Sequence, residues 1–506
     1  MGRKIWMFIL AIFAGYGLLA YYYLRYGGPH TQDVARARPP GYRPSYAETR
    51  SLGSSANPND RFIRPRAKGA ASDCTEEVAY WLNFPDDAAP RLPDPRAMGL
   101  DPGVTKDSGR YVTFETDHGG WNNIRMAFEA VAVFALVTRR TLVMPPAQFL
   151  YLLNKDSQGK NNKLGVRDIF DMEDLGKHLD VITMEEFLQR EKVDTGGKDY
   201  KDLWGRHLWP MLREIVDFTP KWSPDKYCLW FGDEASANST RAKQFCSDKR
   251  EVIRYVDDPG AKVIHFRTEP ENGYRMLTHF YTFLGFQDPS VDRSVKRWAR
   301  RFMHYKSEIV CAAGKLQRIL RDKIGARHYA SYHIRRGDLQ YAVVKIPAEE
   351  IVENIRDVVP AGIPAYVGTD ERDKSFFDKL KAFHGGQLYF LDDLIEEAGS
   401  DFELSPNYYG MMEQLLCAGG STFVGTHFST FSGYIARLRG YRKWPSKSNY
   451  YPTKAHKYKY HPDKMPRRAH PVWYPREWPT SWERLDVDTE TQPRPDMTTD
   501  DDQWFE

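Results

Sequence analysis

The chain has 506 residues, and 41% of them are hydrophobic, which is enough to bury a large core in two domains or two halves. Its 72 Lys and Arg residues nearly balance its 68 Asp and Glu residues, so the net charge of +4 does not indicate a nucleic-acid partner. Aromatic residues make up 14% of the chain, which argues against extensive disorder.

The N-terminus predicts a membrane anchor. Residues 5–24 (IWMFILAIFAGYGLLAYYYL) form an uncharged run long enough to cross a bilayer as a helix. No small-residue cleavage site follows, so we expect a retained transmembrane signal anchor after a cytosolic tail, residues 1–4. Basic residues flank both ends, but Arg3 and Lys4 favour a cytosolic N-terminus. We therefore expect a single-pass type II protein with a stem or linker, residues 25–105, and a luminal body.

The cysteines and one glycosylation motif bear on the compartment. Asn238-Ser239-Thr240 is an N-glycosylation sequon, which supports a luminal body, although such triplets also arise by chance. Cys228 and Cys246 flank this motif, and we expect a disulfide between them. Cys311 and Cys417 lie in apolar helical patterns and are interpreted as buried thiols. The five cysteines show no zinc-site spacing, and their odd number leaves at least one unpaired.

The pattern of residues 106–285 predicts an N-terminal Rossmann-like half. A short strand over 111–115 precedes a glycine-rich turn, Asp117 to Asn123, a helix over 124–138 and a strand over 140–144. Residues 152–261 alternate helical pieces with polar loops and give no functional indication.

Residues 286–441 predict a second Rossmann-like half. Two basic helices cover 291–324, and strands and helices then alternate from residue 329 to residue 439, which is typical of a parallel sheet. The fold class is therefore α/β with two such halves. Residues 442–506 begin as an aromatic and basic extension and end as an acidic tail that we expect to be disordered.

Two motifs follow strands in this second half. His333-Ile-Arg335-Arg-Gly-Asp338 places a fixed cationic fork at a strand end, where open α/β sheets bind ligands. Alone it is interpreted as a surface turn. Ser429 and Thr430 begin a helix, where hydroxyls and free N–H groups form an anion site or simply cap the helix. Together the two motifs predict a diphosphate site.

The motif order resembles that of the GDP-fucose protein O-fucosyltransferases. The resemblance rests on the His-x-Arg-Arg-Gly-Asp turn, Gly-Thr-Asp-Glu at 368–371, Ser-Thr-Phe-Ser at 429–432 and the turn Gly-Gly-Trp-Asn-Asn at 119–123. It covers roughly residues 110–150 and 300–440. It implies a glycosyltransferase of the GT-B type that binds GDP-fucose.

The resemblance also implies roles for single residues. Arg335 matches the essential arginine that holds the β-phosphate and neutralises the leaving GDP. Glu413 stands where the family usually has an aspartate that binds guanine. The other predicted donor-binding residues are Asn122, Asn123, His333, Asp370, Ser429, Thr430 and Phe431, and also Asp338, which we expect to brace the arginine turn. A core histidine is the alternative interpretation of His333.

The general base is left open. Some family members have a glutamate just before the asparagine turn, but this chain has Gly119 there. Glu115, Asp117 and His118 are nearby alternatives, of which Asp117 and His118 lie on the turn. A dissociative transition state in which phosphate takes the proton needs no base. Asp-x-Asp triplets occur only in the acidic tail, so we predict no metal site and no cofactor.

The expected reaction is inverting, metal-independent transfer of fucose from GDP-fucose to a Ser or Thr hydroxyl of a protein. A glycan acceptor is an alternative within the same enzyme class. A non-catalytic GDP-sugar receptor or scaffold is the alternative outside it, because the glutamate is missing at position 119. The stem and anchor favour a Golgi membrane over the endoplasmic reticulum.

Overall fold

The computed structural model describes the folded body of the chain. The residues described are 90–99, 109–150, 153, 163–195, 197, 226–246, 250–256, 261–268, 275–276, 278–325, 328–337, 345–399, 402, 404–426, 429–442, 444, 449–450, 482 and 485. The predicted tail, anchor and most of the stem, residues 1–89, lie outside them. Within the described part, no helix combines the length and the apolar character needed to span a membrane.

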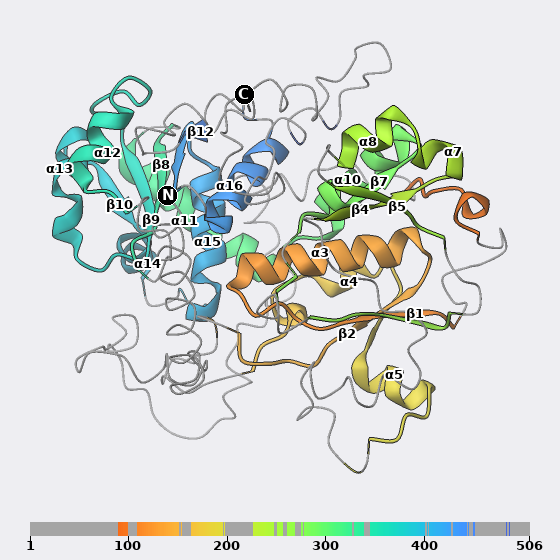
Figure 1. Cartoon of the computed structure of the whole chain (residues 1–506). Helices are drawn as coiled ribbons and strands as arrows, with labels where there is room; N and C mark the ends of the chain where they lie inside the picture. The colour runs from red at the N-terminus through yellow and green to blue at the C-terminus, as the bar shows by residue number, and fades with distance from the viewer. Residues whose placement is uncertain are drawn as a thin grey trace, which may run out of the picture. The chain divides into compact units, whose positions relative to one another are not determined.

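The first half contains two parallel sheets (Figure 1). One has the order β3-β2-β1-β6, and the other has the order β5-β4-β7. The strands are β1 (Tyr111–Phe114), β2 (Thr141–Met144), β3 (Val181–Thr183), β4 (Tyr227–Phe231), β5 (Glu251–Arg254), β6 (Val263–Phe266) and β7 (Leu284–Phe286). The second sheet includes residues for which the sequence pattern predicted no strand, so the first half is more elaborate than a single Rossmann-like unit.

Short helices connect these strands, and α3 is the one long helix of this half among the described residues. The elements are η2 (Pro95–Met98), α3 (Trp121–Val137), η3 (Val166–Asp168), α4 (Met172–Leu175), α5 (Met184–Arg190), α7 (Glu234–Ala237), α8 (Thr240–Cys246) and α9 (Phe280–Phe283). Every residue of α3 except Asn123 is buried. A helix buried on all sides lies inside a protein, and α3 packs on β1, β2 and α9. Figure 1 shows α3 running along the sheet that contains β1 and β2.

The second half is a five-stranded parallel sheet of order β10-β9-β8-β11-β12. Its strands are β8 (Ala330–Ile334), β9 (Ala365–Thr369), β10 (Leu388–Phe390), β11 (Thr422–Gly425) and β12 (Asn449–Tyr450). Its helices are α12 (Ala348–Ile355), η7 (Lys374–Phe377), α13 (Asp378–Phe383), α14 (Leu391–Ala398), η8 (Pro406–Tyr408), α15 (Tyr409–Ala418) and α16 (Thr430–Tyr441). The prediction of an α/β fold with parallel sheets is confirmed.

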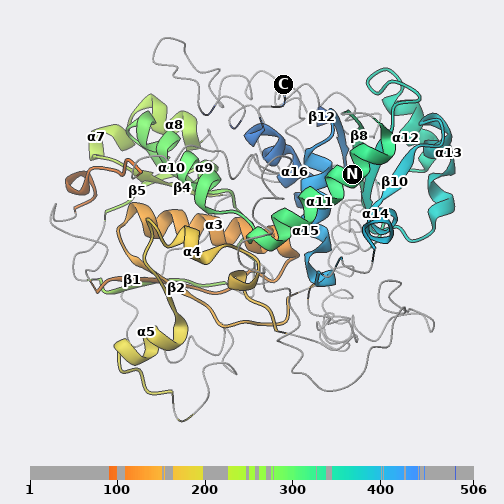
Figure 2. The ribbon, with the colours of Figure 1, turned by 180° about the vertical axis from the view of Figure 1, so that it is seen from behind.

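Two long helices, α10 (Pro289–Phe302) and α11 (Ser307–Ile324), connect the halves. They match the basic helical region predicted over 291–324. Figure 2 shows α11 beside α14 and α15, against which it packs. One hydrophobic core runs continuously from α3 through α10 and α11 to α15 and α16. Smaller clusters cover the opposite faces of the two larger sheets.

The cysteines correct one expectation. Cys228 in β4 and Cys246 in α8 form the predicted disulfide. Cys417 is a buried free thiol, as expected. Cys311 is disulfide-bonded, with a partner outside the described residues, so its interpretation as a thiol was wrong. An apolar helical pattern does not distinguish a half-buried cysteine that faces another segment from a thiol inside the core.

Candidate functional site

The strand β8, at the centre of the five-stranded sheet of the second half, positions the arginine turn. All five residues of β8 are buried, and β9 and β11 pair with it in parallel, with His333 opposite both Gly368 and Gly425. Because parallel strands end at the same sheet edge, the residues that follow these three strands lie side by side. They are Arg335, Asp370 and Thr426. This edge is the site where α/β sheets bind ligands.

Asp370 and Thr426 hold the backbone of the arginine turn. The two carboxylate oxygens of Asp370 accept from the N–H groups of Arg336 at 2.6 Å and Gly337 at 3.1 Å. The Thr426 hydroxyl accepts from the Arg335 N–H at 3.0 Å. A Cβ at residue 337 would lie 2.7 Å from an Asp370 oxygen, so only glycine fits there. Asp370 therefore braces the arginine turn. Asp338, for which bracing was predicted, lies outside the described residues.

The side chains of the two arginines have different surroundings. Arg336 donates to Glu371 Oε2 at 3.0 Å and to the Ile346 carbonyl at 3.0 Å, and its guanidinium lies 3.9 Å from the ring centre of Phe376. Arg335 lies at the sheet edge with a quarter of its side chain exposed, and its Nε is 3.7 Å from Asp370 Oδ2. Arg336 therefore stabilises the turn, and the ligand-binding role of Arg335 stays a prediction.

The helix α16 begins beside this turn with an unused hydroxyl. Ser429 is the N-cap residue, yet its side chain makes no capping hydrogen bond. Its Oγ is buried and has no hydrogen-bond partner within the described part of the chain. A buried hydroxyl without a partner costs free energy, which a bound acceptor would recover. Capping therefore does not account for Ser429, and the hydroxyl supports the predicted anion site. Thr430 and Phe431, the first two residues of α16, are half-buried.

His333 lies beneath this helix start. Its Nδ1 is 2.7 Å from Ser432 Oγ, and its ring stacks on Phe431 with 4.3 Å between ring centres. Burial, and then the charge of Arg335, lowers the pKa of His333 to about 3, so the ring is neutral at physiological pH. These contacts favour the interpretation as a core histidine that supports Phe431. A direct nucleotide contact stays a prediction.

Glu413 approaches the same edge from α15, which packs on β9. Gly368 of β9 lies against it, because a Cβ there would be in ordinary van der Waals contact with Glu413 Cβ, at 3.5 Å. Burial raises the pKa of Glu413 to about 8, and the nearby charges of Asp370 and Asp392 add to this, while a backbone hydrogen bond from Thr369 opposes it. A carboxyl whose ionisation is suppressed in this way needs a donor partner to ionise.

The asparagine turn differs from its prediction in one respect. The helix α3 begins at Trp121, so Asn122 and Asn123 lie in its first turn rather than before it. Asn122 is buried, and its Oδ1 accepts from Gln414 Nε2 of the second half at 3.0 Å. Asn123 Oδ1 is buried and has no hydrogen-bond partner among the described residues. Asn123 can therefore still accept a hydrogen bond from a ligand.

Gly119 could not be replaced by a glutamate in this arrangement. A Cβ there would lie 2.4 Å from Asn123 Nδ2, 2.6 Å from Arg275 Nη2 and 2.7 Å from Asp117 Oδ1. The place of the family glutamate is thus filled by neighbouring side chains. The chain either uses another base or uses none.

The nearby acidic residues have structural partners. Asp117 is 1% exposed and accepts from the N–H groups of Gly119 and Met276, both at 2.6 Å, and from Arg275. Burial raises its pKa, and Arg275 and the two backbone donors oppose this effect. Burial also works to raise the pKa of Glu115, but two hydrogen bonds from Thr268 and the His265 ring, whose Nε2 is 3.7 Å from Glu115 Oε1, hold it below its usual value. His118, on the same turn, is half-buried.

The structure adds residues that the sequence did not single out. Gln414 joins Asn122 to the Tyr305 hydroxyl, which donates to Gln414 Oε1 at 2.6 Å. Glu129 of α3 binds Arg125 at 2.8 Å and Arg437 of α16 at 2.7 Å, all three essentially inaccessible. The sequence indicates such residues only through charges that lie inside apolar helical patterns, because a buried charge requires a partner.

No group of three or more His, Cys, Asp or Glu side chains with metal-binding geometry occurs among the described residues. The prediction of metal independence remains a prediction.

Comparisons with known proteins agree with the motif order. The family model described as GDP-fucose protein O-fucosyltransferase matches residues 111–442. No curated protein matches significantly. Similar solved structures include POFUT1 in complex with GDP-fucose (14% identity, covering 70% of this chain and 99% of that chain, TM-score 0.35). They also include the fucosyltransferase NodZ from Bradyrhizobium (12% identity, 65% and 92%, TM-score 0.34).

Proposed function

The chain belongs to the GDP-fucose protein O-fucosyltransferase family, and on this premise we propose that it transfers fucose from GDP-fucose to a Ser or Thr hydroxyl of a protein, with inversion and without a metal. The observation that carries the donor site is that Arg335 and Ser429, whose hydroxyl has no hydrogen-bond partner within the described residues, follow neighbouring strands. A cationic fork opposite a helix N-terminus suits a diphosphate.

Arg335 and the start of α16 would stabilise the departing GDP. Breaking the bond between fucose and diphosphate develops negative charge on the phosphate oxygens, and donors already held in place there are the largest expected catalytic contribution. Asp370 and Thr426 hold the arginine turn before the donor arrives. Glu413 would accept hydrogen bonds from guanine, and Asn123 would face the sugar.

The acceptor hydroxyl must lose a proton. Asp117 is buried, and both of its oxygens already accept hydrogen bonds. We propose His118, the other residue predicted on this turn, as the group that receives this proton. Replacement of His118 by Asn lowers transfer in this mechanism and leaves GDP affinity unchanged. If the phosphate takes the proton instead, the variant keeps full turnover.

We place the body in the lumen of the secretory pathway, anchored to a Golgi membrane by residues 5–24. The Cys228–Cys246 disulfide supports this compartment, because such bonds persist in oxidising environments.

The decisive experiment is a donor screen. The purified chain is incubated with a panel of GDP-sugars and a mixture of protein and glycan acceptors, and products are identified by mass spectrometry. Fucose on a Ser or Thr of a protein supports the proposal. Fucose on a glycan would show that the acceptor is a glycan and not a protein hydroxyl. If the chain binds GDP but neither transfers fucose nor hydrolyses GDP-fucose, it acts as the non-catalytic receptor of the alternative.

Arg335 provides the mechanistic test. Replacement by Ala should lower kcat by about 10²–10³-fold, the usual cost of one donor to a developing anion. Lys should restore part of the loss, since it keeps the charge but lacks the planar fork. Arg356→Ala, at an exposed position just after α12, is the matched control and should not affect kcat. Undiminished turnover in Arg335→Ala would refute the mechanism.

A further inference from the structure

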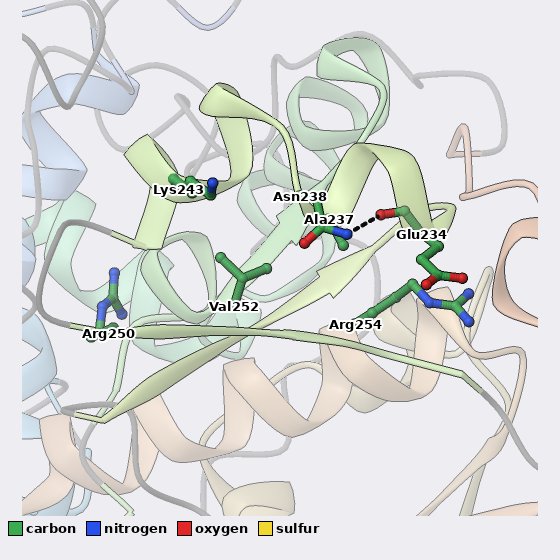
Figure 3. Close-up of a pocket in the computed structure, with 7 residues that line it drawn as sticks. All are labelled: Glu234, Ala237, Asn238, Lys243, Arg250, Val252 and Arg254. Carbon is green, nitrogen blue, oxygen red and sulfur yellow. Dashed lines mark hydrogen bonds between the residues drawn. The ribbon is translucent and has the colours of Figure 1, made fainter.

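A pocket on the first half lies apart from the arginine edge. It has a volume of about 670 Å³ and opens between the helices α7 and α8 and the strand β5, which is the edge of its sheet (Figure 3). Val252 of β5 lies at its base, and Glu234, Asn238, Lys243 and Arg254 surround it. The family match assigns no role to this pocket.

Its chemistry suits a neutral polar ligand. Arg250 also lines the pocket, but its guanidinium donates to the carbonyls of Cys246, Thr282 and Phe245 at 2.7–3.1 Å. It therefore caps the end of α8 rather than binding an anion. The remaining rim combines one acid with two bases above the apolar Val252. Sugar rings have the matching character, with an apolar face and hydroxyls at the edge.

Asn238 lines this pocket and has the sequence context for covalent attachment of a sugar. It is the first residue of the sequon Asn238-Ser239-Thr240, it follows α7 directly, and both Asn238 and Thr240 are exposed. The Cys228–Cys246 disulfide links the strand before this turn to the helix after it. A disulfide around an exposed sequon is the combination expected of a luminal chain.

We propose that Asn238 carries an N-linked glycan whose first sugar occupies this pocket. In the linking step, Asn238 Nδ2 forms a bond to the anomeric carbon of an N-acetylglucosamine. The bond between that carbon and the diphosphate of a lipid-linked oligosaccharide donor breaks. The lipid diphosphate leaves, and the amide gives up one proton.

The modified side chain keeps its contact in the fold. Asn238 Nδ2 donates to the Glu234 carbonyl at 3.1 Å (Figure 3). A glycosylated amide retains one N–H, so this bond can persist in the modified side chain. The proposal rests on the luminal location proposed above. Transfer from GDP-fucose is assayed on the same preparations, so that absence of the glycan and absence of the enzyme activity are told apart.

The test of attachment uses the full chain made in a eukaryotic secretory cell. Mass spectrometry of glycopeptides should find an oligosaccharide on Asn238 in the wild type and in Thr240→Ser, which keeps the sequon. Asn238→Gln and Thr240→Ala should both lack it. An unmodified Asn238 in the secreted or membrane-bound wild type overturns the proposal.

A second measurement tests the position of the first sugar. An endoglycosidase trims the wild-type glycan to a single N-acetylglucosamine, and melting temperatures are compared. The trimmed and the untrimmed protein should have the same melting temperature, and that of Asn238→Gln should be about 1–2 °C lower. If the trimmed protein has the melting temperature of Asn238→Gln, the first sugar does not occupy the pocket.

Discussion

Glu413 makes the stability of the ligand-free protein depend on pH. Its carboxyl lies against Gly368 and near Asp370, so that in the ligand-free protein burial and like charge hold its pKa near 8 instead of 4.5. Between these two values the folded state keeps a proton that the unfolded state has released. The free energy of unfolding therefore falls as pH rises from about 4.5 to about 8. Donors on a bound guanine would reverse this preference.

Two consequences are expected for Glu413→Gln. GDP affinity of the wild type should rise as pH increases through about 8, because guanine N–H groups need the ionised carboxylate. The Gln variant should bind GDP about 10–100-fold more weakly and without this pH dependence. At pH 8 the ligand-free Gln variant should have a higher melting temperature than the ligand-free wild type. Calorimetric titration and thermal melts at several pH values measure both effects.

The control for this prediction is Glu396→Gln, at an exposed position in α14. It should change neither GDP affinity nor melting temperature. A wild type whose GDP affinity is flat from pH 6 to pH 9 would contradict the role assigned to Glu413.

At the scale of elements, the helices α3 and α16 join the two halves through buried charge. Glu129 of α3 binds Arg125 on its own helix and Arg437 on α16. The Arg125 guanidinium also lies 3.6 Å from the ring centre of Tyr434. A buried charge is tolerated only when it is paired, and Glu129 is a carboxylate that both arginines share.

Glu129→Gln should therefore destabilise the fold by about 3–5 kcal/mol, the usual cost of breaking a buried ion pair. Denaturant unfolding measures this change. Glu353→Gln, at an exposed position in α12, makes the same chemical change and should have little effect. Equal stability of the two variants would show that the buried network does not hold the helices together.

The helix α15 connects the halves at the site itself. Gln414, adjacent to Glu413, donates to Asn122 at the start of α3. We expect Gln414 to be a positioning residue. Gln414→Leu keeps the side chain's size but removes this bond, and kcat should fall about tenfold while GDP affinity stays near wild type. A parallel loss of GDP affinity would indicate a general disturbance of α15 instead.

For the whole molecule, the disulfide and the arginine edge lie in different halves. Cys228 and Cys246 are separated by 18 positions, so their bond should contribute about 3 kcal/mol. The double variant Cys228→Ser, Cys246→Ser should melt lower and still bind GDP with wild-type affinity. Melting curves and GDP titration test this separation. Weakened GDP binding would mean that the first half supports the donor edge.

Local pattern determined much of this protein. Strand and helix alternation predicted the sheet from β8 to β11, and the turn chemistry around Arg335 and Ser429 predicted a ligand-binding edge on it. Both features can be predicted from short stretches of sequence, since strand periodicity and helix starts depend on residues that are near neighbours in the chain. The motif order then indicated the family, which the family model confirms.

Only the tertiary structure decided which partners these residues have. Asp370 braces the arginine turn from another strand, Arg275 fills the space beside Gly119, and Gln414 reaches Asn122 across the two halves. The sheet formed by β4, β5 and β7 also escaped prediction. Its strands are short and pair across intervening segments. Contacts between residues far apart in the chain leave no local pattern, because only folding brings them together.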